Sequence, residues 1–390
     1  MKLSPIHPFP ARMAPEIVIR ELEGLGASRV ILDPMSGSGT VLRAAAELGH
    51  NAIGFDLDPL SVLMARVWTT PFTPTKLPHA AKRLVERAKT LTDEHLPWID
   101  DCDETRDYVK FWFGRKQMKA LRRLSFILAD ASGVLADAMR IAMSRTIVTK
   151  ERGASRARDT SHSRPHRVFF DNDYDVYEGF LESANRLATR LTPEKLRGSA
   201  VVKTGDARRL SLLPSNSVDI VITSPPYLNA IDYLRGHRLS LVWLGYDVSA
   251  IRTLRSQTIG AERRGDASLS QSTMERLLRK AGAAENLPVR ELGMVRRYAQ
   301  DAHAFLRELA RVTKRGGRVL LVVGNSRLKG VPVWNAEINV AAAEMAGFKT
   351  TGRSERALPT AHRYLPPPAA DGSGNLGRRM RTETLLNFSI

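Results

Sequence analysis

The chain has 390 residues, enough to bury a full hydrophobic core and to form one large domain with a smaller domain or a long insertion. Its 43% hydrophobic and 26% charged residues are typical of a soluble globular protein, and its apolar runs fall short of the roughly 20 residues that a membrane span needs. The single cysteine, Cys102, excludes a disulfide framework and a cysteine-rich zinc site and favours a reducing cytoplasm. The first residues, "MKLSPIHPFPARM", contain no apolar core, so we expect no signal peptide.

Charge is the strongest signal in the composition. There are 59 Lys and Arg residues against 41 Asp and Glu, which gives a net charge of +18 and an isoelectric point near 10.3. A solvated basic surface without a partner would give the same balance, but a polyanion, most simply nucleic acid, explains it better. A membrane surface is a weaker alternative, because no long amphipathic helix has a clean basic face.

The first 69 residues predict a βαβ unit. A short helix is expected over Ala14–Glu23, followed by a strand in "SRVILDP". The stretch "SGSGTVLRAAAELGH" reads as a glycine-rich turn that opens a helix, and "NAIGFDLDP" as a second strand that ends in acids. The order strand, helix, strand favours a parallel sheet.

Helical periodicity then dominates residues 70–197, which we interpret as a largely helical, basic insertion. One polar interruption, Ser144–Val168, carries seven basic residues against two acids. Its histidines have no cysteine or acid at ligand spacing, so we expect no metal site. Five arginines of the interruption are candidates for contact with phosphates: Arg152, Arg156, Arg158, Arg164 and Arg167.

Strands return after the insertion. Segment 198–246 contains "SAVVKTGDA" and "SVDIVITS", which predict two strands, and 247–295 is a second basic segment poor in aromatic residues. In 296–390, "HAFLRELARVTKRGGRVLLVVGN" predicts a helix, a glycine turn and a buried strand, and "FKTTGRSER" and "TETLLNFSI" predict a final strand pair. Alternating strands and helices predict a doubly wound α/β sheet of the Rossmann-like class.

A glycine loop, "DPMSGSGT", lies between the first strand and the next helix. Gly37 and Gly39 would let the backbone approach a ligand, with the first N–H groups of the helix facing it. The loop is not a P-loop, because no Gly-Lys-Ser/Thr follows, and Leu42 stands where a dinucleotide fingerprint has its third glycine. Acids at Asp33 and Asp56 suit a cationic ligand with a ribose, whose two hydroxyls Asp56 would bind.

A second unusual feature is the strand "VDIVIT", which runs directly into Ser224-Pro225-Pro226-Tyr227. Two adjacent prolines cannot extend a strand ladder or sit inside a helix, because each lacks an N–H group and has φ fixed near −65°. They therefore predict a stiff turn at the end of a buried strand.

Taken together, "HPFPARMAPEI", "DPMSGSGT", "GFDLDP" and "TSPPY" resemble the amino-group DNA methyltransferases, which use S-adenosylmethionine (AdoMet) to methylate cytosine N4 or adenine N6. The resemblance covers a catalytic core of roughly 1–69, 198–246 and 296–390. It implies an AdoMet methyltransferase sheet, AdoMet as the cofactor and double-stranded DNA as the partner, in the nucleoid-associated cytoplasm of a bacterium or archaeon. A cognate restriction nuclease is a further partner that the resemblance allows.

The resemblance also assigns residues to the cofactor. Asp33, Gly37, Gly39 and Thr40 would line the methionine end of AdoMet. Asp56 would bind the ribose, and Asp206 would lie beside the adenine amino group. Phe9 and Arg12, in the N-terminal segment, would lie near the carboxylate of the cofactor.

Two features depart from the family. Met35 stands where phenylalanine is usual, and the glycine loop precedes the tetrad, whereas many enzymes with this tetrad have the reverse order. About 180 residues separate the two motifs. The target-recognition region is therefore 70–197, 247–295 or both.

The tetrad suits an amino-group acceptor. An exocyclic amino nitrogen is a poor nucleophile, because its lone pair is delocalised into the ring. Ser224 Oγ and the Pro225 carbonyl could accept its two hydrogens, and Pro226 stiffens the turn, so that catalysis rests on positioning and preorganised dipoles. Tyr227 offers a face for a flipped base. Asn229, Asp232 and Tyr233 follow where they could reach the base edge, although helix capping explains Asn229 equally well.

Three functions remain open. A serine at the first position of the tetrad favours cytosine N4 over adenine N6 within the DNA methyltransferases. An RNA base methyltransferase is the second candidate, although no appended RNA-binding motif is recognisable. The third is a non-catalytic nucleic-acid-binding protein, against which the intact tetrad and cofactor acids argue.

Overall fold

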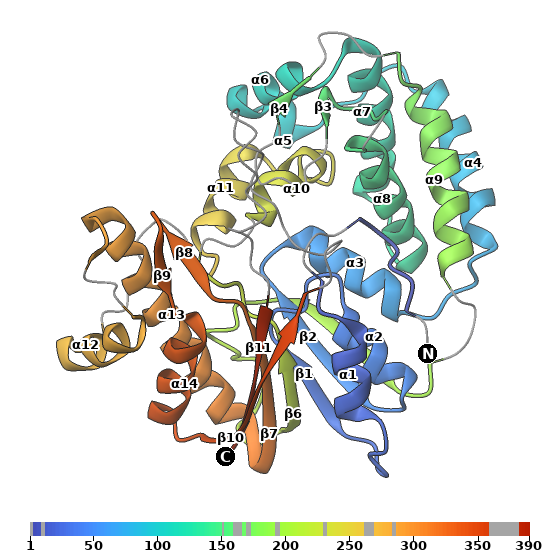
Figure 1. Cartoon of the computed structure of the whole chain (residues 1–390). Helices are drawn as coiled ribbons and strands as arrows, with labels where there is room; N and C mark the ends of the chain where they lie inside the picture. The colour runs from blue at the N-terminus through green and yellow to red at the C-terminus, as the bar shows by residue number, and fades with distance from the viewer. Residues whose placement is uncertain are drawn as a thin grey trace. The chain divides into compact units, whose positions relative to one another are not determined.

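A computed structural model of the chain describes residues 3–8, 12–149, 152–158, 166–168, 173–191, 196–228, 232–260, 269–282, 286–358 and 382–390. The chain forms two compact units, whose elements are labelled in Figure 1. The helical unit consists of Met1–Pro10, Asp58–Leu196 and Asp232–Arg255, and the sheet unit of Ala11–Leu57, Arg197–Ile231 and Ser256–Ile390.

The sheet unit is built on one large sheet. Within the described residues it has seven strands in the order β10-β11-β7-β6-β1-β2-β5. The strands from β7 to β5 are parallel, and β11 is antiparallel to both of its neighbours. The strands are β1 (Val30–Asp33), β2 (Asn51–Asp56), β5 (Ser199–Thr204), β6 (Val218–Thr223), β7 (Thr313–Val323), β10 (Lys349–Ala357) and β11 (Thr382–Ser389).

Helices cover both faces of this sheet, as Figure 1 shows. Side chains alternate along each strand, so that Leu32, Val221 and Val319 share one face, and all three belong to the hydrophobic cluster that includes the buried side of α13 and α14. The predicted doubly wound α/β sheet and its final strand pair are thus confirmed. The helices are α1 (Pro15–Leu22) and α2 (Thr40–Glu47) on one face, and α12 (Gln271–Lys280), α13 (Val289–Val312) and α14 (Asn335–Met345) on the other.

Close packing of α2 on the sheet depends on Gly54 of β2. A Cβ atom at this position would lie 2.4 Å from Leu42 Cδ1, closer than real Cβ contacts allow. The large Leu42 therefore fits against the sheet because the strand beneath it carries no side chain at that point.

The predicted glycine turn between α13 and its strand is wrong. Helix α13 ends at Val312, and β7 begins at Thr313 and continues through Gly316 and Gly317. The two glycines form a bulge, because the register with β6 shifts between its first pairs and Gly316 has φ of 73°. The chain thus turns without leaving the sheet.

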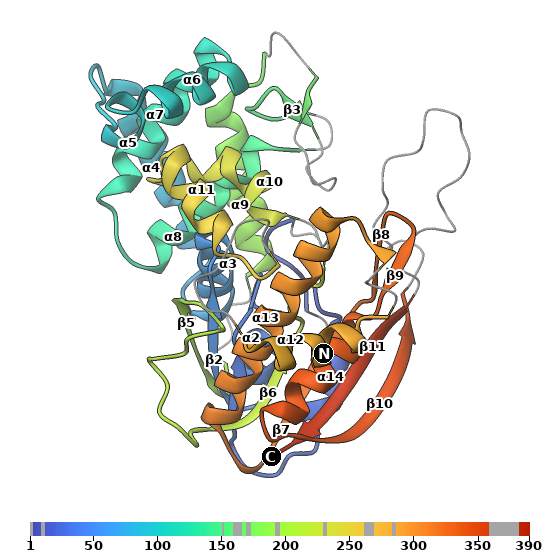
Figure 2. The same ribbon diagram turned by 90° about the vertical axis from the view of Figure 1, so that its left-hand side faces the viewer.

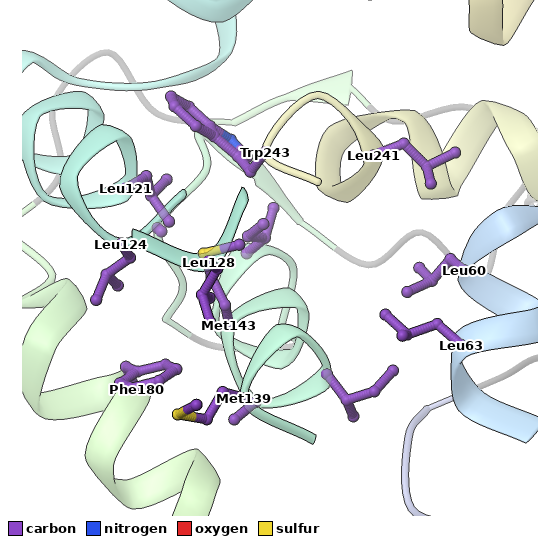
Figure 3. Packing of buried hydrophobic residues seen from close by; sticks show 14 of the residues in the cluster. Leu60, Leu63, Leu121, Leu124, Leu128, Met139, Met143, Phe180, Leu241 and Trp243 are labelled. Atoms are coloured by element: carbon purple, nitrogen blue, oxygen red, sulfur yellow. The ribbon is translucent and has the colours of Figure 1, made fainter. Parts of the chain in front are cut away.

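The helical unit has a hydrophobic core of its own. Figure 3 shows leucine, methionine and aromatic side chains from several helices meeting in it. Its helices are α3 (Pro59–Thr69), α4 (Lys76–Thr90), α5 (Pro97–Asp100), α6 (Asp103–Trp112), α7 (Arg115–Ala129), α8 (Val134–Ile147), α9 (Val176–Arg190), α10 (Tyr233–Leu241) and α11 (Val248–Ser256). None of the helices in the described residues is long and apolar enough to cross a membrane.

Two segments outside the predicted insertion join the helical unit. Residues 232–255 contribute Trp243, which is buried in the core and whose carbonyl accepts a hydrogen bond from Ser125 Oγ at 2.9 Å. The N-terminal segment, Met1–Pro10, contributes His7, whose Nε2 lies 3.1 Å from Ser144 Oγ. Burial lowers the pKa of His7 to about 3, so the ring is neutral at physiological pH.

A buried ion pair joins α3 to α10 within this unit. Asp58 caps α3 by accepting a hydrogen bond from Leu60 N at 2.9 Å, and its Oδ2 is also hydrogen-bonded to Nδ1 of His237. Burial raises the pKa of Asp58, but the charge and hydrogen bond of His237 reverse this and hold the pKa below its ordinary value. The side chain of Asp58 is therefore used in contacts within the helical unit.

Candidate active site

The glycine loop turns sharply between β1 and α2. Gly37 has φ of 49° and Gly39 has φ of 88°, both in the left-handed region that favours glycine. Gly39 is also the N-cap of α2, and its N–H donates to Ser36 O at 2.8 Å. The loop therefore folds back on itself and points the first turn of α2 towards the carboxyl ends of the strands.

Asp56 at the end of β2 holds this loop. Its Oδ2 accepts a hydrogen bond from Gly37 N at 2.8 Å, and the Ser36 N–H donates to Phe55 O at 2.8 Å. β1 and β2 are parallel neighbours, so the predicted ribose acid and the predicted glycines lie together at one edge of the sheet.

Asp33 at the end of β1 is almost fully buried. Its Oδ1 accepts hydrogen bonds from Thr223 Oγ1 at 2.7 Å and from Met35 N at 3.2 Å. Burial raises the pKa of Asp33 to about 7, and the nearby charge of Asp56 adds to the shift. A positively charged ligand beside Asp33 would lower that pKa again.

Two hydroxyl groups of the loop point to a ligand with polar groups. Ser36 and Ser38 are 6% and 5% exposed, and neither Oγ has a hydrogen-bond partner among the described residues. Buried hydroxyls are rarely left unsatisfied in folded proteins. The Ser36 and Ser38 hydroxyls and the first N–H groups of α2 together form a polar site, here called the cradle, that suits a small polar molecule.

Asp206 lies at the turn after β5, where an adenine contact is predicted. Its two carboxylate oxygens accept hydrogen bonds from Arg208, including 2.7 Å from Nη2 to Oδ2. The same guanidinium reaches Asp301 of α13 at 2.6 Å, and Asp301 in turn accepts from Gly260 N at 2.8 Å. Arg208 therefore fixes the orientation of Asp206, a role that the sequence reasoning missed.

The tetrad follows β6 at the same edge of the sheet. Ser224 is half-buried and donates its hydroxyl hydrogen to the carbonyl of Val322, at 3.0 Å. Pro225 is buried, and Pro226 and Tyr227 are half-buried. The Thr223 hydroxyl is hydrogen-bonded to Asp33, so the tetrad and the glycine loop are neighbours.

The far end of the tetrad loop is bonded to Ser326, the first residue of β8 (Ser326–Leu328). Ser326 Oγ donates to the carbonyl of Leu228 and accepts from Asn335 Nδ2 at 2.7 Å. Asn335 also donates to Gly324 O at 2.8 Å. The sequence reasoning missed both residues; the available signal was the polar run "GNS" directly after a buried strand.

The other predicted residues lie on α10, before α1 or outside the described part of the chain. Phe9 and Asn229 lie outside the described residues, and Arg12 is exposed just before α1. Asp232 caps α10, accepting from Arg235 N at 3.2 Å, and Tyr233 is the first residue of that helix. Both belong to the helical unit.

The candidate phosphate-binding arginines have different surroundings. Arg156 donates to the carbonyls of Lys110 and Phe111, each at 3.1 Å, so it caps the end of α6. Arg167, on the short strand β4 (His166–Arg167), stacks 5.1 Å from the centroid of the Phe111 ring. Arg152 is exposed, Arg158 lies on β3 (Ala157–Arg158), and Arg164 is outside the described residues.

No group of three or more His, Cys, Asp or Glu side chains that could hold a metal ion occurs in the described part of the chain.

Comparison with known proteins gives three curated relatives, and no protein-family model matches the chain. The chain is 26% identical to the Type II methyltransferase M.BsoBI of Geobacillus stearothermophilus, over 86% of this chain and 76% of that protein. It is 24% identical to the Type II methyltransferase M.MvaI of Kocuria varians, over 61% of this chain and 56% of that protein. The third, the Type II methyltransferase M.MjaII of Methanocaldococcus jannaschii, is 29% identical over 29% of this chain and 23% of that protein.

Solved structures give weaker likenesses. A SAM-dependent methyltransferase from Methanosarcina mazei aligns over 95% of this chain and 96% of its own, at 9% identity and a TM-score of 0.33. An S-adenosylmethionine-dependent methyltransferase from Mesorhizobium loti aligns over 97% and 98%, at 11% identity and the same TM-score of 0.33.

Proposed function

We propose that the chain is an AdoMet-dependent DNA methyltransferase that methylates the exocyclic amino group of a flipped base, with cytosine N4 as the acceptor. One observation carries the proposal. Thr223, just before the tetrad, donates a hydrogen bond to Asp33, just before the glycine loop. The site for the amino group and the site for the cofactor therefore share one edge of the sheet. The similarity to three proteins named Type II methyltransferases supports the same function.

The cofactor is AdoMet, which supplies a methyl group on a positively charged sulfur. The cradle fits it by the chemistry of its groups. Asp33 supplies a negative charge for the sulfonium, the loop hydroxyls and N–H groups suit the methionine end, and Asp56 suits the ribose hydroxyls. Asp206, held by Arg208, suits the adenine amino group.

Ser224 accepts a hydrogen bond from the target amino group. Its own hydrogen is already donated to Val322 O, so its oxygen can act towards the base only as an acceptor. The Pro225 carbonyl accepts the second amino hydrogen, and the two prolines prevent that carbonyl from rotating away. Drawing both hydrogens out of the ring plane frees the nitrogen lone pair for attack, without a covalent enzyme intermediate.

Tyr227 holds the flipped base by stacking, since the amino nitrogen cannot be reached inside the duplex. The neutral, short side chain of Ser224 suits cytosine N4 better than adenine N6. DNA in the cytoplasm is the substrate, either within a restriction–modification pair or for an enzyme that acts alone.

The test is nucleoside mass spectrometry of DNA and RNA incubated with the purified protein and AdoMet. N4-methylcytosine in DNA is the expected product. N6-methyladenine as the only product would overturn the cytosine assignment but keep the mechanism. Methylated RNA with unmodified DNA would overturn the substrate class, and no methyl transfer to either would leave a nucleic-acid-binding protein.

A further inference from the structure

A basic hairpin follows the strand that supports the tetrad. Strands β8 (Ser326–Leu328) and β9 (Val331–Val333) are antiparallel and are joined by the two-residue turn Lys329-Gly330. In Figures 1 and 2 the hairpin extends beyond the carboxyl end of β7. It belongs wholly to the sheet unit.

The turn carries a lysine where the backbone favours glycine or asparagine. Lys329 has φ of 48° and Gly330 has φ of 85°, the pair of positive values that a two-residue hairpin turn requires. A side chain with a Cβ atom is disfavoured in this left-handed conformation. A strained residue at an exposed tip is frequently associated with function, and the residue held in this conformation here is positively charged.

The hairpin presents its positive charges without neutralising acids. Arg327 and Lys329 are both exposed, and neither has an ion-pair partner within the described residues. The sequence from Gly324 to Ala336 contains no acidic residue. Arg327 Nη1 donates to Gly330 O at 3.0 Å, which keeps the guanidinium at the tip. Such a surface complements a polyanion.

The base of the hairpin is joined to the tetrad loop. Ser326, its first residue, donates to the carbonyl of Leu228, the residue after Tyr227. Asn335 holds the Ser326 hydroxyl in that direction, and the side chain of Asn325 accepts a hydrogen bond from Ala336 N at 3.1 Å. Hydrogen bonds therefore connect the base of the basic hairpin to the tetrad loop.

We propose that Arg327 and Lys329 bind backbone phosphates of DNA beside the flipped base, and that Ser326 aligns the tetrad with the strand so bound. The inference rests on the proposed function and adds the element that places the backbone. Arg327 and Lys329 contribute binding, whereas Ser326 is a positioning residue.

The test compares charge-matched double variants in the full chain. Arg327→Gln with Lys329→Asn removes two charges, and asparagine tolerates the left-handed turn, so the hairpin should persist. The control is Arg315→Gln with Arg318→Gln, which removes two exposed charges from the other end of β7. A charge-conserving variant, Arg327→Lys with Lys329→Arg, should restore binding.

DNA binding is measured by fluorescence anisotropy across a salt series, on a duplex carrying the site that the wild type methylates. Each phosphate contact contributes roughly 0.9 to the slope of log K against log salt, so losing two contacts should lower the slope by about 1.8. We expect that change for the hairpin variant only, with a higher KM for DNA and unchanged AdoMet binding. Ser326→Ala should instead lower kcat with the DNA Kd retained, and Ser326→Thr should restore kcat.

Failure of the inference differs from failure of the proposed function. A wild type that methylates no DNA overturns the proposed function, and methylation of RNA alone does the same. A wild type that methylates DNA, with a hairpin variant whose salt slope and KM match those of the control variant, overturns the inference alone.

Discussion

The hydroxyl of Ser224 donates a hydrogen bond to the carbonyl oxygen of Val322, at 3.0 Å, across 98 positions of the chain. This bond uses the only hydroxyl hydrogen of the side chain, so the Ser224 oxygen is left as an acceptor. In the proposed mechanism this oxygen accepts a hydrogen of the target amino group, and the bond to Val322 already orients it for that role.

Ser224→Ala should slow methyl transfer by about 10²–10³-fold, the effect of deleting one preorganised polar group in an active site. Binding of AdoMet should hardly change, because the proposed partner of Ser224 is the target base and not the cofactor. Single-turnover transfer to DNA measures the first quantity, and calorimetry the second.

A matched control for this variant is Ser217→Ala. Ser217, just before β6, donates to Pro214 O at 2.7 Å and is remote along the strand from the tetrad. The proposed role of Ser224 fails if both variants slow transfer equally.

Asp56→Ala should weaken AdoMet binding by about 1.5–3 kcal/mol, the range for losing hydrogen bonds to a charged acceptor. The fold should survive, because Asp56 is the last residue of β2 and its side chain is bonded to the glycine loop through Gly37 N. Calorimetric titration gives the affinity. Asp219→Ala is the control: Asp219 lies near the start of β6 and pairs with Lys314 at 2.8 Å, so its loss should lower stability without changing the affinity.

AdoMet binding should release protons from Asp33 below neutral pH. Burial raises the pKa of Asp33 to about 7, so the group is largely protonated at pH 6 in the absence of ligand. A sulfonium beside it favours the carboxylate and lowers the pKa. Calorimetry at pH 6 in buffers of different ionisation enthalpy should show release approaching one proton.

The same titrations at pH 8 should show little release, because Asp33 is then already ionised. Asp33→Asn should abolish the release at pH 6. Binding enthalpies that do not depend on the buffer at pH 6 would place the sulfonium away from Asp33.

The raised pKa of Asp33 also predicts how the stability of the free protein depends on pH. A group whose folded pKa exceeds its unfolded value stabilises the folded state most below the unfolded pKa, and this contribution is lost as pH rises through the folded pKa. For Asp33 the window runs from 3.8 to about 7. Asp33→Asn should remove this component from the free energy of unfolding of the sheet unit, measured by denaturant titration with backbone circular dichroism.

Asp58→Asn should destabilise the helical unit by about 3 kcal/mol near pH 7, because it removes the buried carboxylate that accepts hydrogen bonds from His237 and Leu60 N. The pKa of Asp58 is lowered in the folded state, so its stabilising contribution is present above the unfolded pKa and is lost as pH falls through the folded pKa. The difference between variant and wild type should therefore vanish in strong acid. Tryptophan fluorescence follows this unit, which contains Trp68, Trp98, Trp112 and Trp243.

Much of the sheet unit could be predicted from the sequence, because its signals are local. Apolar strands that end in Asp33, Asp56 and Thr223 place these residues at one edge once the strands are parallel. Gly37 and Gly39 needed no partner to be recognised, since positive φ is a property of the residue itself. The turn of the glycine loop and its proximity to the tetrad follow from these local rules.

The remaining features depend on contacts between distant parts of the chain. The N-terminal segment and residues 232–255 join the helical unit, because buried groups such as His7 and Trp243 are hydrogen-bonded there. No local sequence pattern predicts these contacts. Arg208 bridges Asp206 and Asp301, which lie 95 positions apart, and only the packing of α13 against the sheet brings them together.

The hydrogen bonds that hold the tetrad show most clearly which features depend on the tertiary structure. The sequence determined that a serine, two prolines and a tyrosine end a buried strand, because proline forbids continuation of the ladder. Only the tertiary structure decided that Ser224 donates to Val322 and that Ser326 donates to Leu228, each across 98 positions. These bonds depend on the register of β6 with β7, and a shift of one residue would turn the side chains to the opposite face.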